Sequence, residues 1–315
     1  MWRALPALIL TDLRLALRMR TVVFFNYLFP LMFFFAFAEF LDAHGEACAQ
    51  VAGMVLVIGI LGNGLWGAGM RLVQEREANI LRRFRVTPIS PTPILLASVV
   101  TGWLLYLPAL ALLCALAHWI YGMPLPTRWV SLLVLTSCGI WAFRAIGLIV
   151  ASVVNGVQES TVLIQLLYMP MLFLGGAAIP VELLPAWAQV AARFVPSYYL
   201  VSSMQNALGR GDPSAWYGSE IAAMLLTTGV GLFISRQAFR WEKDDPISPR
   251  ARWYLAAVLA PFLLLGVWQL ATAPPADGAR KPSPAERITP PDTPSSADPA
   301  AGCAQCPPHR PRFPA

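Results

Sequence analysis

The chain has 315 residues, of which 57% are hydrophobic and 13% are charged, and its mean hydropathy is +0.58. A soluble domain carries about 25% charged residues, so this composition excludes an ordinary soluble protein and indicates a polytopic membrane protein. The net charge of +6 does not by itself indicate nucleic-acid binding. The basic residues lie between apolar runs, where they orient membrane spans and contact anionic lipid.

Residues 1–20 predict an amphipathic helix. Thr11, Arg14 and Arg18 share one face, and leucine and isoleucine side chains occupy the other side. The helix is too polar to span a bilayer, so it is expected to lie along the cytoplasmic interface. The alternative is a basic N-terminus that only fixes the orientation of the chain.

Six apolar runs predict the core membrane spans, because a helix needs about 20 apolar residues to cross a bilayer. The runs cover residues 21–41, 51–70, 94–120, 129–150, 161–174 and 219–235. A seventh run, 253–271, is long enough to cross once more. Residues 272–315 are rich in proline, alanine and serine, so they are expected to be disordered. The predicted fold is an all-α polytopic membrane protein, with a transmembrane domain over 21–240, a seventh span and a proline-rich tail.

The segment 71–93 concentrates charge between two apolar runs. It contains five arginines together with Glu75 and Glu77. Such a charge density cannot lie in hydrocarbon, and the positive-inside rule places it in the cytoplasm.

A short helix is predicted inside this segment. Ile80, Leu81 and Phe84 fall on one face of it. Thr87-Pro88 ends the helix, because proline lacks a backbone donor and disfavours helix in the preceding residue. A helix with such an apolar face can dock into a groove on a soluble partner; the alternative is an ordinary charged loop.

Residues 175–217 break the apolar pattern with glycine and proline. The apolar pieces between the breaks are each too short to span, and one of them, 186–194, has a helical pattern. Non-helical backbone at membrane depth is tolerated only inside protein or along a water-filled cavity. The segment therefore predicts a re-entrant hairpin near the outer face.

Polar side chains inside the predicted spans are few. Arg144 is an ionisable residue at membrane depth, which makes it a functional candidate. Its position near the cytoplasmic end favours snorkelling to the interface, and pairing with Glu159 is the second choice. Gln165 adds some polarity to the fifth span.

The chain lacks the motifs of several enzyme classes. It has only Lys243 and Lys281, and neither follows a glycine, so no GxxxxGK[ST] phosphate loop is present. HExxH and GxSxG motifs are also absent. No catalytic residue and no metal site is expected, and the lone CxxC of Cys303 and Cys306 is interpreted as incidental.

The charged segment resembles the coupling-helix loop of the type-2 ABC transporter permeases, the membrane subunits of bacterial ATP-driven exporters. The residues that carry the match are Glu75, Glu77, Ile80, Leu81, Arg85, Thr87, Pro88 and Ser90. In that family the loop inserts into a separate ATP-binding subunit. The resemblance therefore implies that these residues, together with Phe84, couple the chain to an ATPase.

The interrupted segment also resembles this family, which has a Gly…Pro…Leu-Pro-x-Trp…Pro-x-Tyr pattern there. The matching residues are Gly175, Pro180, Leu184, Pro185, Trp187, Pro196 and Tyr198. In the family these helices cap the outer mouth of the translocation path, so the residues are expected to form an outer gate. The resemblance covers residues 1–240, and the seventh run and the tail depart from it.

The resemblance implies the permease subunit of an ABC exporter for a hydrophobic or amphipathic substrate. It implies that two permease chains form a dimer and that two separate ABC ATPase subunits bind to it. ATP and Mg²⁺ would bind in those ATPase subunits. The chain is expected in a bacterial inner membrane, with its N-terminus in the cytoplasm. Counting spans places the C-terminal tail outside. Two alternatives stay open: an ion-coupled secondary transporter, which would need buried carboxylates or histidines at mid-membrane, and a membrane assembly or anchoring protein.

Overall fold

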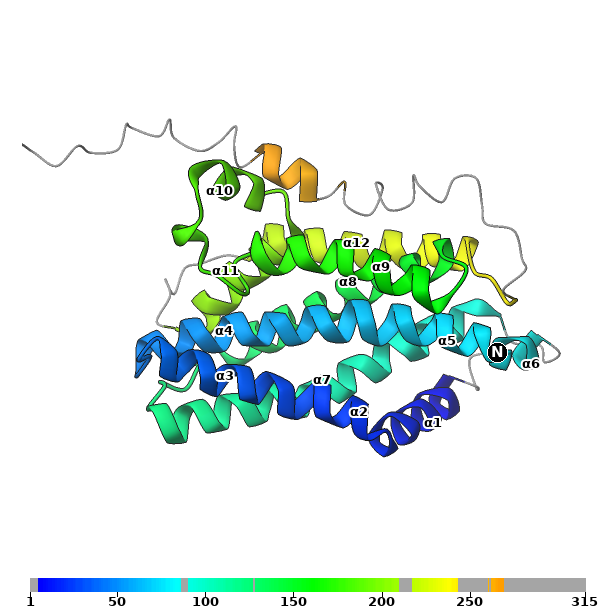
Figure 1. Cartoon of the computed structure of the whole chain (residues 1–315), viewed down its shortest axis with the longest axis horizontal. Coiled ribbons are helices and arrows are strands. Elements are labelled where there is room, and N and C mark those ends of the chain that lie inside the picture. Colours follow the sequence, from blue (N-terminus) through cyan, green and yellow to red (C-terminus); the bar gives the residue numbers. More distant parts are fainter. Residues whose placement is uncertain are drawn as a thin grey trace, which may run out of the picture. The chain divides into compact units, whose positions relative to one another are not determined.

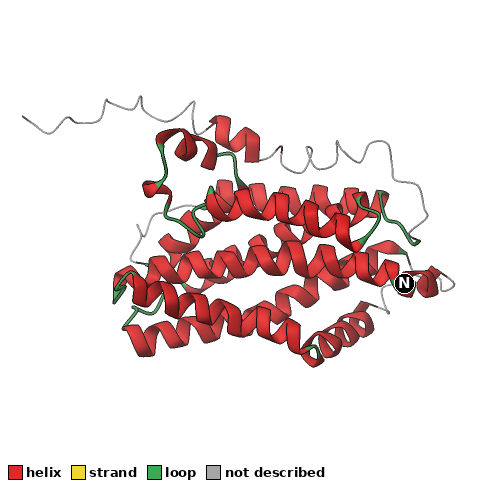
Figure 2. Cartoon of the chain, viewed as in Figure 1, coloured by secondary structure: helices red, strands yellow, loops and turns green. Residues whose placement is uncertain are grey.

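A computed structural model of the chain describes residues 5–85, 90–126, 128–209, 217–242, 260 and 262–268. All the regular secondary structure in these ranges is helical (Figure 2). The predictions for Thr87, Pro88, the 272–315 tail and its two cysteines fall outside the described residues, as does most of the seventh run.

The helices follow one another along the chain with short connections (Figure 1). They are α1 (Leu5–Arg18), α2 (Arg20–Val23), the π-helix η2 (Phe24–Leu28), α3 (Phe29–Phe40), α4 (Glu46–Leu61), the π-helix η3 (Gly62–Met70), α5 (Arg71–Glu77), α6 (Ile80–Arg85), α7 (Pro91–Tyr121), α8 (Trp129–Val153), α9 (Val157–Phe173), the 3-10 helix η4 (Val181–Leu183), α10 (Ala186–Ala192), α11 (Pro196–Leu208) and α12 (Gly218–Gln237).

Four helices in the described part of the chain are long and apolar enough to cross a membrane. They are Ala47–Glu77, Pro91–Tyr121, Trp129–Val153 and Gly218–Gln237, and they confirm the second, third, fourth and sixth apolar runs as helices of spanning length. The first run is a shorter apolar helix, Phe24–Phe40, and the fifth is the 17-residue α9. That these two runs also cross stays a prediction.

The second span is longer than the sequence predicted. The helix does not end at residue 70 but continues through η3 and α5 to Glu77, so that α4, η3 and α5 form one rod (Figure 1). The predicted loop therefore begins as helix. No proline interrupts residues 46–77, and the rod ends only where Asn79 takes a positive φ of 56°. Asparagine tolerates this left-handed conformation better than most residues.

Helix α8 packs between η3 and α12. Its approach to η3 depends on glycine: a Cβ atom added at Gly147 would lie 2.6 Å from the carbonyl oxygen of Gly64, and one added at Gly69 would lie 2.6 Å from the carbonyl oxygen of Gly147. Small residues allow such close backbone contact between membrane helices. Helix α1 packs along α7, and α11 packs on α4. Helix α5 in turn contacts α6, α8 and α9, which places it beside the α8–α9 connection.

Candidate functional site

The site lies where α5, α6 and the α8–α9 connection meet, which we call the arginine-rich end. Helices α5 and α6 extend past the neighbouring helices there (Figure 1). The sharp turn at Asn79 separates the two helices and sets the direction of α6. The α8–α9 junction, defined as residues 151–157, contains the last turn of α8 and the start of α9.

Arg76 joins α5 to this junction. Its side chain is only 1% exposed. Its guanidinium donates to the carbonyl oxygens of Ala151 (2.9 Å) and Val154 (2.7 Å). Carbonyls in the last turn of a helix have no partner within the helix and carry partial negative charge. The two hydrogen bonds therefore give the carbonyls at the end of α8 a donor and give the buried Arg76 guanidinium two acceptors.

Two further contacts strengthen the same junction. Glu77 accepts a 2.8 Å hydrogen bond from the backbone N–H of Val157, at the start of α9. Arg240, which follows α12, donates to the Val154 carbonyl (3.0 Å) and to Oδ1 of Asn155 (3.2 Å). The carbonyl of Val154 is thus shared by two arginines. Displacement of α5 would therefore be transmitted to α8, α9 and the end of α12.

Glu75 has a structural role on the other side of α5. Arg71 donates to Glu75 (2.8 Å) and to Asp12 of α1 (2.7 Å). The three charged groups connect the N-terminal helix to the base of the rod. The helix expected over 1–20 is thus present as Leu5–Arg18, and an ion pair that the sequence did not reveal holds it in place.

The three apolar residues predicted to dock on a partner do not share one surface. Ile80 is 42% exposed, whereas Leu81 is fully buried in the core of this chain. Phe84 is partly buried and packs against the same core. Leu81 therefore packs inside this chain, and its contact with a partner stays a prediction that would require Leu81 to become exposed. Among the described side chains of α6, Ile80 and its neighbours Arg82 and Arg83 are exposed.

Arg144 is buried at membrane depth and does not snorkel. It is 3% exposed, and Nη1 donates to Oδ1 (2.7 Å) and the backbone oxygen (3.1 Å) of Asn63 in η3. Nη2 donates to the hydroxyl of Ser98 in α7 (3.1 Å), and Asn63 in turn donates to Oδ1 of Asn26 in η2 (3.0 Å). This polar network links four helical segments, and both interpretations from the sequence were wrong. The arginine side chain is long enough to reach Asn63 in the neighbouring π-helix η3.

The other two polar candidates lie elsewhere. Glu159 is exposed and accepts a hydrogen bond from the backbone N–H of Asn155 (2.8 Å), which caps the start of α9. Gln165 is exposed on α9. Neither contacts Arg144 among the interactions that the structure describes.

The segment predicted as a hairpin, 175–217, contains η4, α10 and α11, and its start packs against α11; that it is re-entrant stays a prediction. Ser197 donates a 2.5 Å hydrogen bond to the carbonyl oxygen of Met171, and a Cβ atom at Gly175 would overlap the Ser197 hydroxyl. Gly176 has a φ of +80°, which favours glycine. The helical pattern expected over 186–194 is present as α10.

The expected gate residues face different surroundings. Pro196 is buried, Tyr198 is half-buried, and Trp187 is 72% exposed at the tip. A cavity of about 220 Å³ lies within this segment, between residues 176–193 and α11. The polar residues that line it are Glu182, Gln189, Arg193, Tyr198, Ser202 and Gln205.

The described part of the seventh run packs on this hairpin. Phe262 is 1% exposed and its ring lies 6.1 Å from that of Tyr199. A Cβ atom added at Gly266 would lie 2.8 Å from the carbonyl oxygen of Arg193. This contact fixes residues 262–268 against the start of α11.

Comparison with known proteins identifies the family of this arrangement. The model of the ABC-2 type transporter family matches residues 3–208, which include both the arginine-rich end and the hairpin. The chain is 22% identical over 235 residues to a protein of Bacillus subtilis named as a transport permease, YvfS, covering 72% of this chain and 95% of that protein. It is 25% identical over 173 residues to the inner membrane transport permease YhhJ of Escherichia coli, covering 55% of this chain and about half (46%) of that protein.

A third relative is nodulation protein J of Rhizobium leguminosarum bv. trifolii, which is 29% identical over 118 residues, covering 36% of this chain and 44% of that protein. The family match covers more than half of the chain, and two of these relatives are named as transport permeases. The chain therefore belongs to the ABC-2 type transporter family, as a multi-pass membrane transport permease.

Proposed function

We propose that this chain is the permease subunit of an ABC exporter, working as a dimer with two copies of a separate ATPase. The observation that carries the proposal is the exposed Ile80, which lies at the end of a 31-residue helical rod and beside buried contacts to the α8–α9 junction. A soluble partner that binds α6 would move the rod and the junction together. ATP and Mg²⁺ would bind in the partner, since this chain has no phosphate-binding loop.

The charge distribution supports a cytoplasmic location for the arginine-rich end. Arg71, Arg76, Arg82, Arg83 and Arg240 all lie there. Arginine-rich segments next to membrane spans stay on the cytoplasmic side. In this orientation the hairpin faces outward, in a bacterial inner membrane, and a hydrophobic or amphipathic substrate would leave beneath it.

The buried polar groups argue against an ion-coupled transporter. The described side chains that are buried and polar include Asn63, Arg76 and Arg144 but no aspartate or glutamate. Ion-coupled transporters place carboxylates or histidines on a path through the membrane. An assembly or anchoring role would not need the buried contacts between α5 and the α8–α9 junction.

The test is the replacement of Ile80 by aspartate in the chain co-reconstituted with its ABC ATPase. Burial of the 42% of Ile80 that stays exposed would contribute about 1 kcal/mol, and a buried, unpaired carboxylate adds a further cost. We therefore expect complex formation to weaken by about tenfold and ATPase stimulation to fall in parallel. Membrane insertion should be unchanged, because Ile80 is exposed. Phe40, 85% exposed at the end of α3, provides the control. Wild-type binding by the Ile80→Asp variant, or equal loss in Phe40→Asp, would refute the proposed docking surface.

A further inference from the structure

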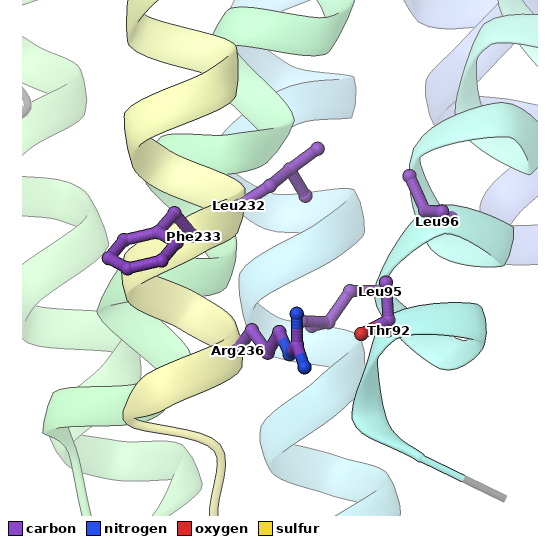
Figure 3. A pocket seen from close by; sticks show the side chains of 6 residues that line it. All are labelled: Thr92, Leu95, Leu96, Leu232, Phe233 and Arg236. Carbon is purple, nitrogen blue, oxygen red and sulfur yellow. The ribbon is translucent and has the colours of Figure 1, made fainter.

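A narrow slot separates α7 from α12 at the arginine-rich end. Its volume is about 220 Å³, and its lining residues come only from these two helices (Figure 3). Four of them are apolar and two are polar. They are Leu95, Leu96, Leu232, Phe233, Thr92 and Arg236.

The polar and apolar residues are ordered along the axes of α7 and α12. Thr92 lies in the first turn of α7 and Arg236 in the last turn of α12, so the two are at the same end of antiparallel helices. The leucines and Phe233 lie about one turn, or roughly 5 Å, deeper on the same helices. The slot thus repeats the polarity of one leaflet of a bilayer, with a cation at the headgroup level and apolar walls below it.

Among the described residues, Arg236 has no partner for its charge. Its side chain is exposed and extends across the slot toward Thr92 (Figure 3). It forms no hydrogen bond or ion pair with any described residue, unlike Arg71, Arg76, Arg82 and Arg240. None of the described residues that line the slot is acidic. Its guanidinium is therefore available for an external anion with bidentate oxygen geometry, such as a phosphate.

We propose that this slot binds an anionic phospholipid of the adjacent leaflet. The phosphate is held by Arg236 and the Thr92 hydroxyl, and one acyl chain lies against Leu96, Leu232 and Phe233. The slot has room for about seven water molecules. It therefore holds the upper part of one acyl chain rather than a whole lipid. Because α12 also continues into Arg240 and the α8–α9 junction, a bound lipid would stabilise the end of α12 beside the site described above. This inference does not depend on the proposed export function.

The experiment is native mass spectrometry of the full chain, purified in a mild detergent with equal amounts of phosphatidylglycerol and phosphatidylethanolamine. The wild type should retain phosphatidylglycerol selectively. Arg236→Gln should lower that retention at least fivefold, and Leu96→Trp should lower it similarly by filling the slot while the charge stays. Arg83→Gln is the matched control, since Arg83 is also an exposed arginine at this end but lines no part of the slot. Unfolding temperatures of all variants verify that each is folded.

Three results would overturn the proposal. The first is wild-type phosphatidylglycerol retention in both slot variants. The second is absence of selective retention in the wild type, as expected if a second copy of the chain covers the slot. The third is complete displacement of the lipid by millimolar inorganic phosphate, which would show that the site recognises phosphate without the acyl chain.

Discussion

Replacement of Arg76 by alanine is expected to abolish partner-stimulated ATP hydrolysis and transport. Arg76 supplies the two buried hydrogen bonds that fix α5 to the carbonyls of Ala151 and Val154. Hydrogen bonds to a charged group contribute about 1.5–3 kcal/mol, and the Ala151 carbonyl would lose the partner described here. We therefore expect two results: a lower unfolding temperature, measured on the chain purified alone, and loss of ATPase stimulation, measured with the ATPase present.

The same residue offers a graded comparison. Arg76→Lys keeps the charge but lacks the planar fork that reaches two carbonyls at once, so it should restore stability only in part. Arg83→Ala removes an exposed arginine from α6 and should leave the unfolding temperature unchanged. Normal stimulation of the ATPase by the Arg76→Ala variant would show that the α8–α9 junction is not needed for coupling.

Replacement of Gly147 by leucine is expected to destabilise the whole helix arrangement. A Cβ atom there would lie 2.6 Å from the carbonyl oxygen of Gly64 and 3.1 Å from that of Leu65. These neighbours are backbone atoms, so they cannot rotate away, and α8 must separate from η3. Overpacking of this kind costs about 1–3 kcal/mol or more. The expected result is a marked fall in the yield of folded protein and in its unfolding temperature.

Gly229 of α12 provides the matched control, because a Cβ atom there meets nothing within 4 Å. Gly229→Leu should therefore fold as the wild type does. Equal tolerance of leucine at both positions would contradict the close contact between α8 and η3. Loss of function without loss of stability at Gly147 would instead indicate that the contact serves movement rather than folding.

Features that depend on local sequence were predictable. The apolar runs gave the positions of four long helices, and the prolines and glycines after residue 174 located the break between α9 and the short helices that follow it. The exposed Ile80 was found because arginines surround an apolar residue in a segment too charged for lipid. Periodicity and composition are sufficient for such features, because these features depend only on residues that are close together in the chain.

Features that depend on contacts between distant residues were not predictable. Ile80, Leu81 and Phe84 looked like one apolar face, but the turn at Asn79 directs Leu81 into the core. Arg144 was expected to reach the interface or Glu159, yet it binds Asn63, which is 81 residues away in the chain. A single polar residue in the glycine-rich second run was the only signal for that partner.

The burial of Arg76 was also missed, because five arginines in one segment look equally exposed in the sequence. Only the packing of α5 on the α8–α9 junction distinguishes Arg76, at 1% exposure, from Arg83 on the surface. The helix in this segment could thus be predicted, but the burial of its individual arginines could not, and its coupling role stays a prediction.

The most direct test of the account is site-specific cross-linking between α6 and an ABC ATPase in native membranes. Cysteine at Ile80, which is 42% exposed, should cross-link to the ATPase, and the yield should change when ATP hydrolysis is blocked. Cysteine at the adjacent Leu81, which is fully buried, should give no cross-link, and neither should cysteine at Leu183 in the hairpin, which is 74% exposed. Absence of a product from Ile80, or an equal product from Leu183, would contradict the claim that α6 is the surface through which ATP hydrolysis moves this permease.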